Sequence, residues 1–334
     1  MRREKEQGGE RSFPLLCPIQ EDLACVEEIL SQKIDTQAEL IRQAASYMLQ
    51  GKGKRIRPAL LLLSARLCGY RNGSRHIKLA SIGEFLHVAA LIHDDIIDNS
   101  HLRRGRPSAN SRWGNALSVL VGDYLYSRSV KHLIEEEDLE VMRAFADATM
   151  RMVEGEVMEQ EMAGRVDISY QDYMRMITHK TAWLFSACCR VGALISGAGG
   201  DCAEALTRFG LNLGVAFQIM DDALDFVADE GKLGKPVGKD LAEGRITFPL
   251  LYILEKGSSS DREVLKRHAS CTPWQEQQAT EVLSLVEKYQ AVDWARGIAE
   301  EYAQEAKGCL SIFPPSEPKG SLLELADYIL IRDR

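Results

Sequence analysis

The sequence predicts an all-α fold on three observations. No proline occurs between Pro107 and Pro236, and because proline breaks helix interiors, this interval permits several long helices. Apolar residues recur at spacings of three and four in residues 117–133 and 142–162, which is the periodicity of one helix face. Alternating β-branched runs bounded by turn signals, the pattern of strands, do not occur in this interval. We therefore expect helices of about 15–25 residues along the whole chain.

Two segments at the ends of the chain and one inside it depart from the helical pattern. Residues 1–14 predict a polar arm, and residues 15–334 predict a single helical domain, because no linker interrupts them. The glycine- and lysine-rich segment 231–244 predicts a loop. A proline-rich turn at 314–318 predicts the start of a last helix at about 320–332.

Composition excludes several classes of protein. The 334 residues carry a formal net charge of −8, which argues against a nucleic-acid-binding protein, because such a protein needs a basic face. The eight cysteines form no CxxC pair and no Cys/His zinc pattern, which is typical of reduced thiols in a cytoplasmic protein. No apolar run approaches the ~18 residues of a transmembrane helix, so we expect any membrane contact, for instance during product release, to be peripheral.

Two acidic clusters of identical pattern lie in apolar helical stretches. They are Asp94-Asp95-Ile96-Ile97-Asp98 and Asp221-Asp222-Ala223-Leu224-Asp225. Residues four apart share one face of a helix, so the first and last aspartates of each cluster lie one turn apart and repel each other. Oxygen ligands without Cys or His suit Mg²⁺, which commonly bridges carboxylates to substrate phosphates. A solvated helix end would explain one such cluster, whereas two of the same pattern favour a metal site.

Basic residues accompany both clusters. Residues 51–58, Gly-Lys-Gly-Lys-Arg-Ile-Arg-Pro, form a basic turn before a helix, where an anion would relieve the unfavourable interaction with the helix dipole. Arg103 and Arg104 follow the first cluster, and Lys235 and Lys239 follow the second. This pairing indicates an oligophosphate that is held partly through metal and partly by direct contacts.

Taken in order, these motifs resemble the trans-isoprenyl diphosphate synthase family over residues 20–334. The resemblance is carried by the two aspartate clusters and by Gly53–Pro58, Glu84–His87, Arg103–Gly105, Gly122-Asp123, Gly155-Glu156, Lys180–Ala182, Phe217–Met220 and Gly238–Asp240. It implies the isoprenoid synthase fold, with about ten to thirteen helices around a central cavity. It also implies a homodimer and head-to-tail condensation of isopentenyl diphosphate with an allylic diphosphate, geranyl or farnesyl, using three Mg²⁺ per active site.

The resemblance also implies roles for individual residues. Asp94, Asp98 and Asp221 would bind Mg²⁺ directly, and Asp95, Asp222 and Asp225 would act through water or as partners of the ligands. The residues implied to hold the allylic diphosphate are Arg103, Lys180, Lys235 and Lys239. Those implied to hold isopentenyl diphosphate are Lys54, Arg57, His87 and Arg104. Thr181 and Gln218 would present oxygens to the developing allylic cation, so the expected catalytic set is Lys180, Thr181, Gln218, Asp94, Asp95 and Asp98.

Product length in this family depends on the bulk of the residues just before the first cluster. Ala89 and Ala90 stand there, where short-chain enzymes commonly carry an aromatic residue. An open cavity predicts a long all-trans product of about C30–C45, as in octaprenyl-type synthases that supply quinone side chains. Close helix packing is the other explanation for the two alanines. Glu159 stands where the family often has glutamine, and no role is assigned to it.

Three alternative functions are less consistent with the sequence. A short-chain farnesyl or geranylgeranyl synthase would differ in product length alone. A terpene cyclase usually carries an Asn/Ser/Glu motif as its second metal site and needs no second diphosphate site. A non-catalytic subunit of a heteromeric synthase typically loses acidic ligands, whereas all six aspartates are retained here.

Overall fold

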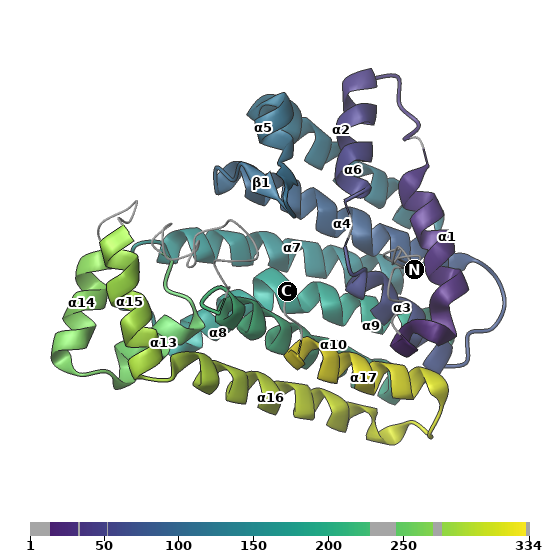
Figure 1. Cartoon of the computed structure of the whole chain (residues 1–334). Helices are drawn as coiled ribbons and strands as arrows, with labels where there is room; N and C mark the ends of the chain where they lie inside the picture. Colours follow the sequence, from purple (N-terminus) through teal and green to yellow (C-terminus); the bar gives the residue numbers. More distant parts are fainter. Residues whose placement is uncertain (1–13, 33, 52, 228–244, 270–275, 332–334) are drawn as a thin grey trace, which may run out of the picture.

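The all-α prediction is confirmed by a computed structural model, which describes residues 14–32, 34–51, 53–227, 245–269 and 276–331. Figure 1 shows a helical assembly in which α7 and α10 run through the middle, α16 lies alongside α10, and the α1–α2 end is opposite the α14–α15 end. The helices are α1 (Gln20–Ser31), α2 (Glu39–Leu49), α3 (Ile56–Leu67), α4 (Arg75–Ile97), α5 (Ala109–Trp113), α6 (Asn115–Glu135), α7 (Leu139–Met162), α8 (Tyr170–Ile177), α9 (Trp183–Ile195), α10 (Gly200–Leu224), α13 (Phe248–Lys256), α14 (Ser259–Ala269), α15 (Glu276–Lys288), α16 (Ala291–Cys309) and α17 (Glu317–Ile331). Three irregular helical turns complete them: η1 (Pro14–Ile19), η2 (Thr178–Ala182) and η3 (Leu310–Ile312).

The strongest periodic segments form the helices expected of them. Residues 117–133 lie within α6 and residues 142–162 within α7, and the last helix, α17, begins at Glu317. Pro318 lies in the first turn of α17, where a proline costs no intrahelical hydrogen bond. The expected loop 231–244 and most of the expected arm 1–14 lie outside the described residues.

Several helices are shorter than expected because local turn chemistry ends them. α3 has 12 residues. It ends shortly before Gly69, whose φ of +89° is the left-handed backbone conformation that commonly ends a helix. It is nevertheless buried over nearly its whole length.

α16 packs against α10 through a stripe of alanines whose small side chains let the two helices approach closely. These are Ala291, Ala295, Ala299, Ala303 and Ala306.

A short hairpin follows the first aspartate cluster and was not expected. Strands β1 (Leu102–Arg103) and β2 (Arg106–Pro107) pair antiparallel. The two residues between them, Arg104 and Gly105, both have positive φ, of 52° and 74°. A turn with positive φ at both residues matches the twist of the two strands that it joins. The side chain of Arg103 contacts Asp95, whereas that of Arg104 lies beside Gly53.

The segment η2 joins α8 to α9 as a single π-helical turn. Turns of this kind are uncommon and are frequent at functional sites. Lys180 and Thr181 both lie in it.

Among the described residues, no helix is both long and apolar enough to cross a bilayer.

Candidate active site

Both aspartate clusters lie at the C-terminal ends of long helices. Asp98 is the C-cap of α4, and Asp225 is the C-cap of α10. The C-terminus of a helix already carries a partial negative charge, so carboxylates at this position add to it. The two helix ends therefore generate a strongly negative potential that favours cations.

The middle aspartate of each cluster points into the protein. Asp95 is fully buried and accepts a hydrogen bond from Nε of Arg103 at 2.9 Å. Asp222 is 4% exposed and accepts hydrogen bonds from the hydroxyl of Tyr173, from Nε2 of Gln218 at 3.0 Å and from the backbone N–H of Phe248 at 3.2 Å. These contacts fix the two carboxylates and thereby the helix ends that carry them.

The remaining aspartates differ in exposure. Asp221 is exposed, Asp94 and Asp225 are half-buried, and the side chain of Asp98 is 8% exposed. Burial raises the pKa of Asp94 to about 7, and the negative charges of Glu156 and Asp98 act in the same direction. Asp98 forms an ion pair with Arg245. The first cluster thus contains carboxylates that are electrostatically unfavourable without a cation.

Lys180 is held against the first cluster by the C-terminal part of α7. Its Nζ lies 2.7 Å from a carboxylate oxygen of Glu156 and also contacts Glu159. Gly155 allows this approach, because a Cβ there would lie 2.3 Å from the backbone nitrogen of Lys180. Two acidic neighbours raise the pKa of Lys180, which is therefore fully charged.

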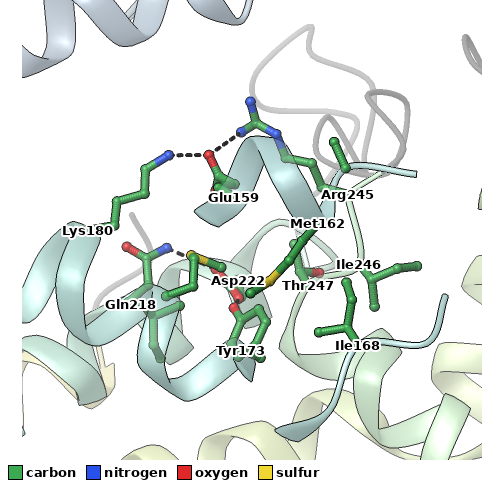
Figure 2. A pocket seen from close by; sticks show the side chains of 13 residues that line it. Glu159, Met162, Ile168, Tyr173, Lys180, Gln218, Asp222, Arg245, Ile246 and Thr247 are labelled. Atoms are coloured by element: carbon green, nitrogen blue, oxygen red, sulfur yellow. Dashed lines mark hydrogen bonds and ion pairs between the residues drawn. The ribbon is translucent and has the colours of Figure 1, made fainter. Parts of the chain in front are cut away.

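A cavity of about 120 Å³ lies beside this lysine, and Figure 2 shows the side chains that line it. Its polar wall comprises Glu159, Lys180, Gln218, Asp222, Arg245 and Thr247, and its apolar wall includes Met162, Ile168, Met176, Ile177 and Ile246. The hydroxyl of Thr181 donates to Oε1 of Gln218 at 2.7 Å, and Nε2 of Gln218 donates to Asp222. Because the Thr181 proton is used in this way, the lone pairs of its oxygen remain able to face a positive charge.

A second group of cations comes from α3, α4 and the hairpin. Arg57 stacks on the Phe185 ring at 4.8 Å, and its buried Nε has no hydrogen-bond partner among the described residues. Burial, together with the positive charges of Arg57 and Arg104, lowers the pKa of His87 well below its usual value. Gly53 lies against Arg104, since a Cβ there would come within 2.5 Å of its guanidinium. Arg57, His87 and Arg104 are thus close enough to act on one another.

Lys54 and Arg55, which precede Arg57, have contacts of their own beside that group. Nζ of Lys54 lies 5.2 Å from the centre of the Tyr328 ring in α17. Arg55 forms ion pairs with Glu84 at 2.6 Å and Glu27 at 2.5 Å. Arg55 therefore stabilises the start of α3, whereas Lys54 remains exposed.

Ala89 and Ala90 occupy different faces of α4. Ala90 is one turn before Asp94 and is half-buried. Ala89 is 3% exposed and one turn before His93, whose ring packs against Gly122 of α6. Ala90 is therefore better placed than Ala89 to lie beside a molecule held at Asp94. Two further predicted residues, Lys235 and Lys239, lie outside the described residues.

Sequence reasoning missed three residues of the site: Glu159, Tyr173 and Arg245. Tyr173 and Arg245 lie far along the chain from the aspartates they contact. No sequence motif contains Tyr173 or Arg245. Gly155, by contrast, was a usable signal, because a glycine inside a helix marks close approach of another segment.

The donor chemistry fits hard divalent cations. Both clusters supply carboxylate oxygens, and Oδ2 of Asp95 is buried without a hydrogen-bond partner in the part of the chain that the structure describes. Within that part, no three His, Cys, Asp or Glu side chains converge as a ready-made metal site.

A model of the family described as polyprenyl synthetase matches residues 38–286. The chain belongs to the polyprenyl synthetase family. The chain is 39% identical over 305 residues to octaprenyl diphosphate synthase of Haemophilus influenzae, and this alignment covers 91% of this chain and 92% of that protein. The predicted family is confirmed, and with it the enzyme class, a prenyltransferase.

Solved structures agree with the fold of this polyprenyl synthetase. A polyprenyl synthase from Caulobacter crescentus, complexed with calcium and isoprenyl diphosphate, is 34% identical, with a TM-score of 0.91 and coverage of 96% of this chain and 97% of that one. A decaprenyl diphosphate synthase from Rhodobacter capsulatus is 36% identical, with a TM-score of 0.90 and coverage of 96% and 98%. The predicted isoprenoid synthase fold is thereby confirmed.

Proposed function

We propose that this enzyme condenses isopentenyl diphosphate head-to-tail with geranyl or farnesyl diphosphate to give a long all-trans polyprenyl diphosphate. The observation that carries the proposal is the pair of carboxylate-bearing helix ends, α4 and α10, with cations from η2, α3 and the hairpin around them. Relatives named as octaprenyl and heptaprenyl diphosphate synthases, whose products have eight and seven five-carbon units, support a product of about C30–C45. Its use in quinone side chains remains a prediction.

We propose that Asp94, Asp98 and Asp221 hold three Mg²⁺, with Asp95, Asp222 and Asp225 as their supporting partners. Mg²⁺ commonly takes one or two carboxylates and completes its shell with waters and substrate phosphates, so ions and diphosphate would bind together. Bound Mg²⁺ would neutralise the negative charge on the leaving pyrophosphate. The calcium in the Caulobacter crescentus structure supports a divalent-cation site in this fold.

Two groups of cations would hold the two diphosphates. Lys180 and Arg103 would contact the allylic diphosphate, with Lys235 and Lys239 as further candidates. Arg57, His87, Arg104 and the exposed Lys54 would contact isopentenyl diphosphate. The buried, unpartnered Nε of Arg57 is a donor for such an anion. His87, neutral because its pKa is lowered, would donate one N–H.

The remaining steps follow from the contacts around Gln218. As the allylic C–O bond breaks, the oxygen of Thr181 would face the positive charge while its hydroxyl continues to donate a hydrogen bond to Gln218. The double bond of isopentenyl diphosphate attacks the cation, and the departing pyrophosphate accepts the proton that is lost. No side-chain base is needed, which agrees with the use of the aspartates as ligands.

The product assay tests this function directly. Purified enzyme is incubated with farnesyl diphosphate, labelled isopentenyl diphosphate and Mg²⁺, and the dephosphorylated product is sized. We expect a product of about C30–C45, because Ala90 leaves the path beside Asp94 open. Absence of incorporation would contradict the synthase function, and a C20 product, the result of a single condensation, would assign the enzyme to the short-chain class.

Ala90→Phe should shorten the product by at least one isoprene unit, because the ring would project from the face of α4 that carries Asp94. The measurement is the same sizing assay, with the melting temperature as a control for folding. Ala89→Tyr should instead destabilise the protein by about 1–3 kcal/mol, since the site is 3% exposed and already packed. An unchanged product from Ala90→Phe would show that this residue does not line the path of the growing chain.

We also propose that the enzyme is a homodimer and that residues 15–334 act as one domain. Support for the dimer comes from large exposed apolar side chains on one stretch of α6 and one of α7: Val119, Leu120, Tyr126, Val130, Ile134, Met150, Val153 and Val157. Exposed apolar surface of this kind is typical of an interface with another protein. Cytoplasmic location and peripheral membrane contact remain predictions from the sequence.

A further inference from the structure

Five charged side chains alternate in sign across the mouth of the site. Lys180 lies between Glu156 and Glu159, and Arg245 lies between Glu159 and Asp98. Figure 2 shows the central part of this series, in which one carboxylate oxygen of Glu159 faces both Lys180 and Arg245. The distance from Glu159 to Nη1 of Arg245 is 3.7 Å. Glu159 is thus the member that joins the two cations.

All five groups are largely shielded from water. The side chains of Glu156, Glu159 and Arg245 are 13%, 15% and 16% exposed. Shielded charges interact more strongly than surface charges and are costly when unpaired. Each cation is consequently held in place by carboxylates of the protein rather than by solvent.

Three of these groups lie where the proposed ligands would bind. Lys180 would contact the allylic diphosphate, Asp98 would bind Mg²⁺, and Arg245, which faces the same oxygen of Glu159 as Lys180, would be a further contact of the diphosphate. Arg245 contacts Asp98, and Glu159 contacts both cations. A diphosphate that binds without Mg²⁺ must displace Glu159, and Mg²⁺ that binds without a diphosphate must displace Arg245.

We propose that Glu159 is a positioning residue that acts as an internal counter-anion for Lys180 and Arg245 and competes with the diphosphate for them. This inference rests on the proposed function. When both ligands bind, the partners are exchanged: Asp98 passes from Arg245 to Mg²⁺, and the two cations pass from Glu159 to phosphate oxygens. With Mg²⁺ alone, Arg245 keeps Glu159 as its acidic partner in this series, whereas a diphosphate takes both cations away from Glu159. Glu159 therefore favours the binding of Mg²⁺ alone and opposes the binding of diphosphate alone.

Glu159→Gln should change the affinities for pyrophosphate and for Mg²⁺ in opposite directions. Removal of this negative charge should strengthen the binding of inorganic pyrophosphate, measured calorimetrically with a chelator present, by about 5-fold, because the anion no longer competes. It should weaken the binding of Mg²⁺ alone by about 3-fold, because Arg245 is left with Asp98 as its acidic partner in this series. A residue with only a structural role would weaken both ligands, so opposite changes are the signature of the counter-anion.

Glu161→Gln is the matched control. Glu161 is exposed on the same helix, two residues further along, and its replacement changes the net charge by the same amount. We expect its two affinities to equal those of the wild type. Equal effects of the two variants, or changes of the same sign for both ligands in Glu159→Gln, would overturn the inference.

Arg245→Gln gives an independent test if Glu159→Gln does not fold. Loss of the guanidinium should strengthen the binding of Mg²⁺ alone, because Asp98 loses its competing partner, and should weaken the binding of pyrophosphate. Wild-type condensation is measured in parallel. A wild type without pyrophosphate binding or condensation would refute the proposed function, whereas an active wild type with no opposite changes in the variants would refute only the role of Glu159.

Discussion

Asp94→Asn should lower the turnover of isopentenyl diphosphate by about 10³-fold or more, because a proposed metal ligand is lost where pyrophosphate must leave. The metal-free variant should melt at the same temperature as the wild type or higher. Burial raises the pKa of Asp94 to about 7, so its charged form is unfavourable and asparagine removes this cost. Incorporation of labelled substrate at saturating Mg²⁺ and thermal unfolding in a chelator are the two measurements.

Asp293→Asn is the control for this substitution. Asp293 is exposed in the first turn of α16 and belongs to neither cluster, and its replacement by asparagine is the same chemical change. It should retain full turnover. A tenfold or smaller loss of turnover in Asp94→Asn would contradict the assignment of Asp94 as a direct ligand.

Gly155→Ala should destabilise the protein by about 3 kcal/mol or more, because the new Cβ would meet backbone that cannot move independently. The nearest atoms are the nitrogen of Lys180 at 2.3 Å and its Cα at 2.7 Å. Turnover should fall as well, since α7 and η2 must separate and Lys180 would leave the mouth. Equilibrium unfolding in urea gives the first quantity, and the product assay gives the second.

The matched substitution Gly297→Ala should have the opposite effect on stability. Gly297 lies inside α16, and among the described residues no atom outside the adjoining backbone of that helix and the neighbouring residues lies within 4 Å of a Cβ built there. Alanine at an open helical position stabilises by about 0.5–1 kcal/mol. Equal changes in both variants would show that Gly155→Ala reports helix propensity alone and that the contact with Lys180 does not limit the size of this residue.

The parts of the site that follow from sequence are those set by local pattern. α6 and α7 were predictable from apolar spacing, and the two aspartate clusters were predictable because each is contiguous. The inward orientation of the middle aspartate of each cluster could not be predicted, because it depends on residues that are distant in sequence. Asp222 is fixed by Tyr173, which is 49 residues away in sequence. No pattern near either residue records that contact.

The hairpin and Arg245 illustrate why the rest could not be predicted. Strands of two residues are too short for alternation to show, although Gly105 marks the turn between them. Arg245 stands 147 positions from Asp98, and only the packing of distant segments brings them together. No role could be assigned to Glu159 from the sequence, because its contacts are with Lys180 and Arg245, which belong to other parts of the chain.

The π turn at η2 sets the helical phase between the two halves of one continuous helical rod. In an α-helix each residue advances by about 100°, so one additional residue in a wider turn offsets α9 from α8 by about that angle. Tyr173 of α8 can thereby face Asp222 while Gly192 of α9 lies against the backbone of Leu61 in α3. A regular α-helix of one residue fewer could satisfy one of these contacts but not both. The irregular turn that carries Lys180 is thus also the joint that keeps both halves of the rod in register with the helices around them.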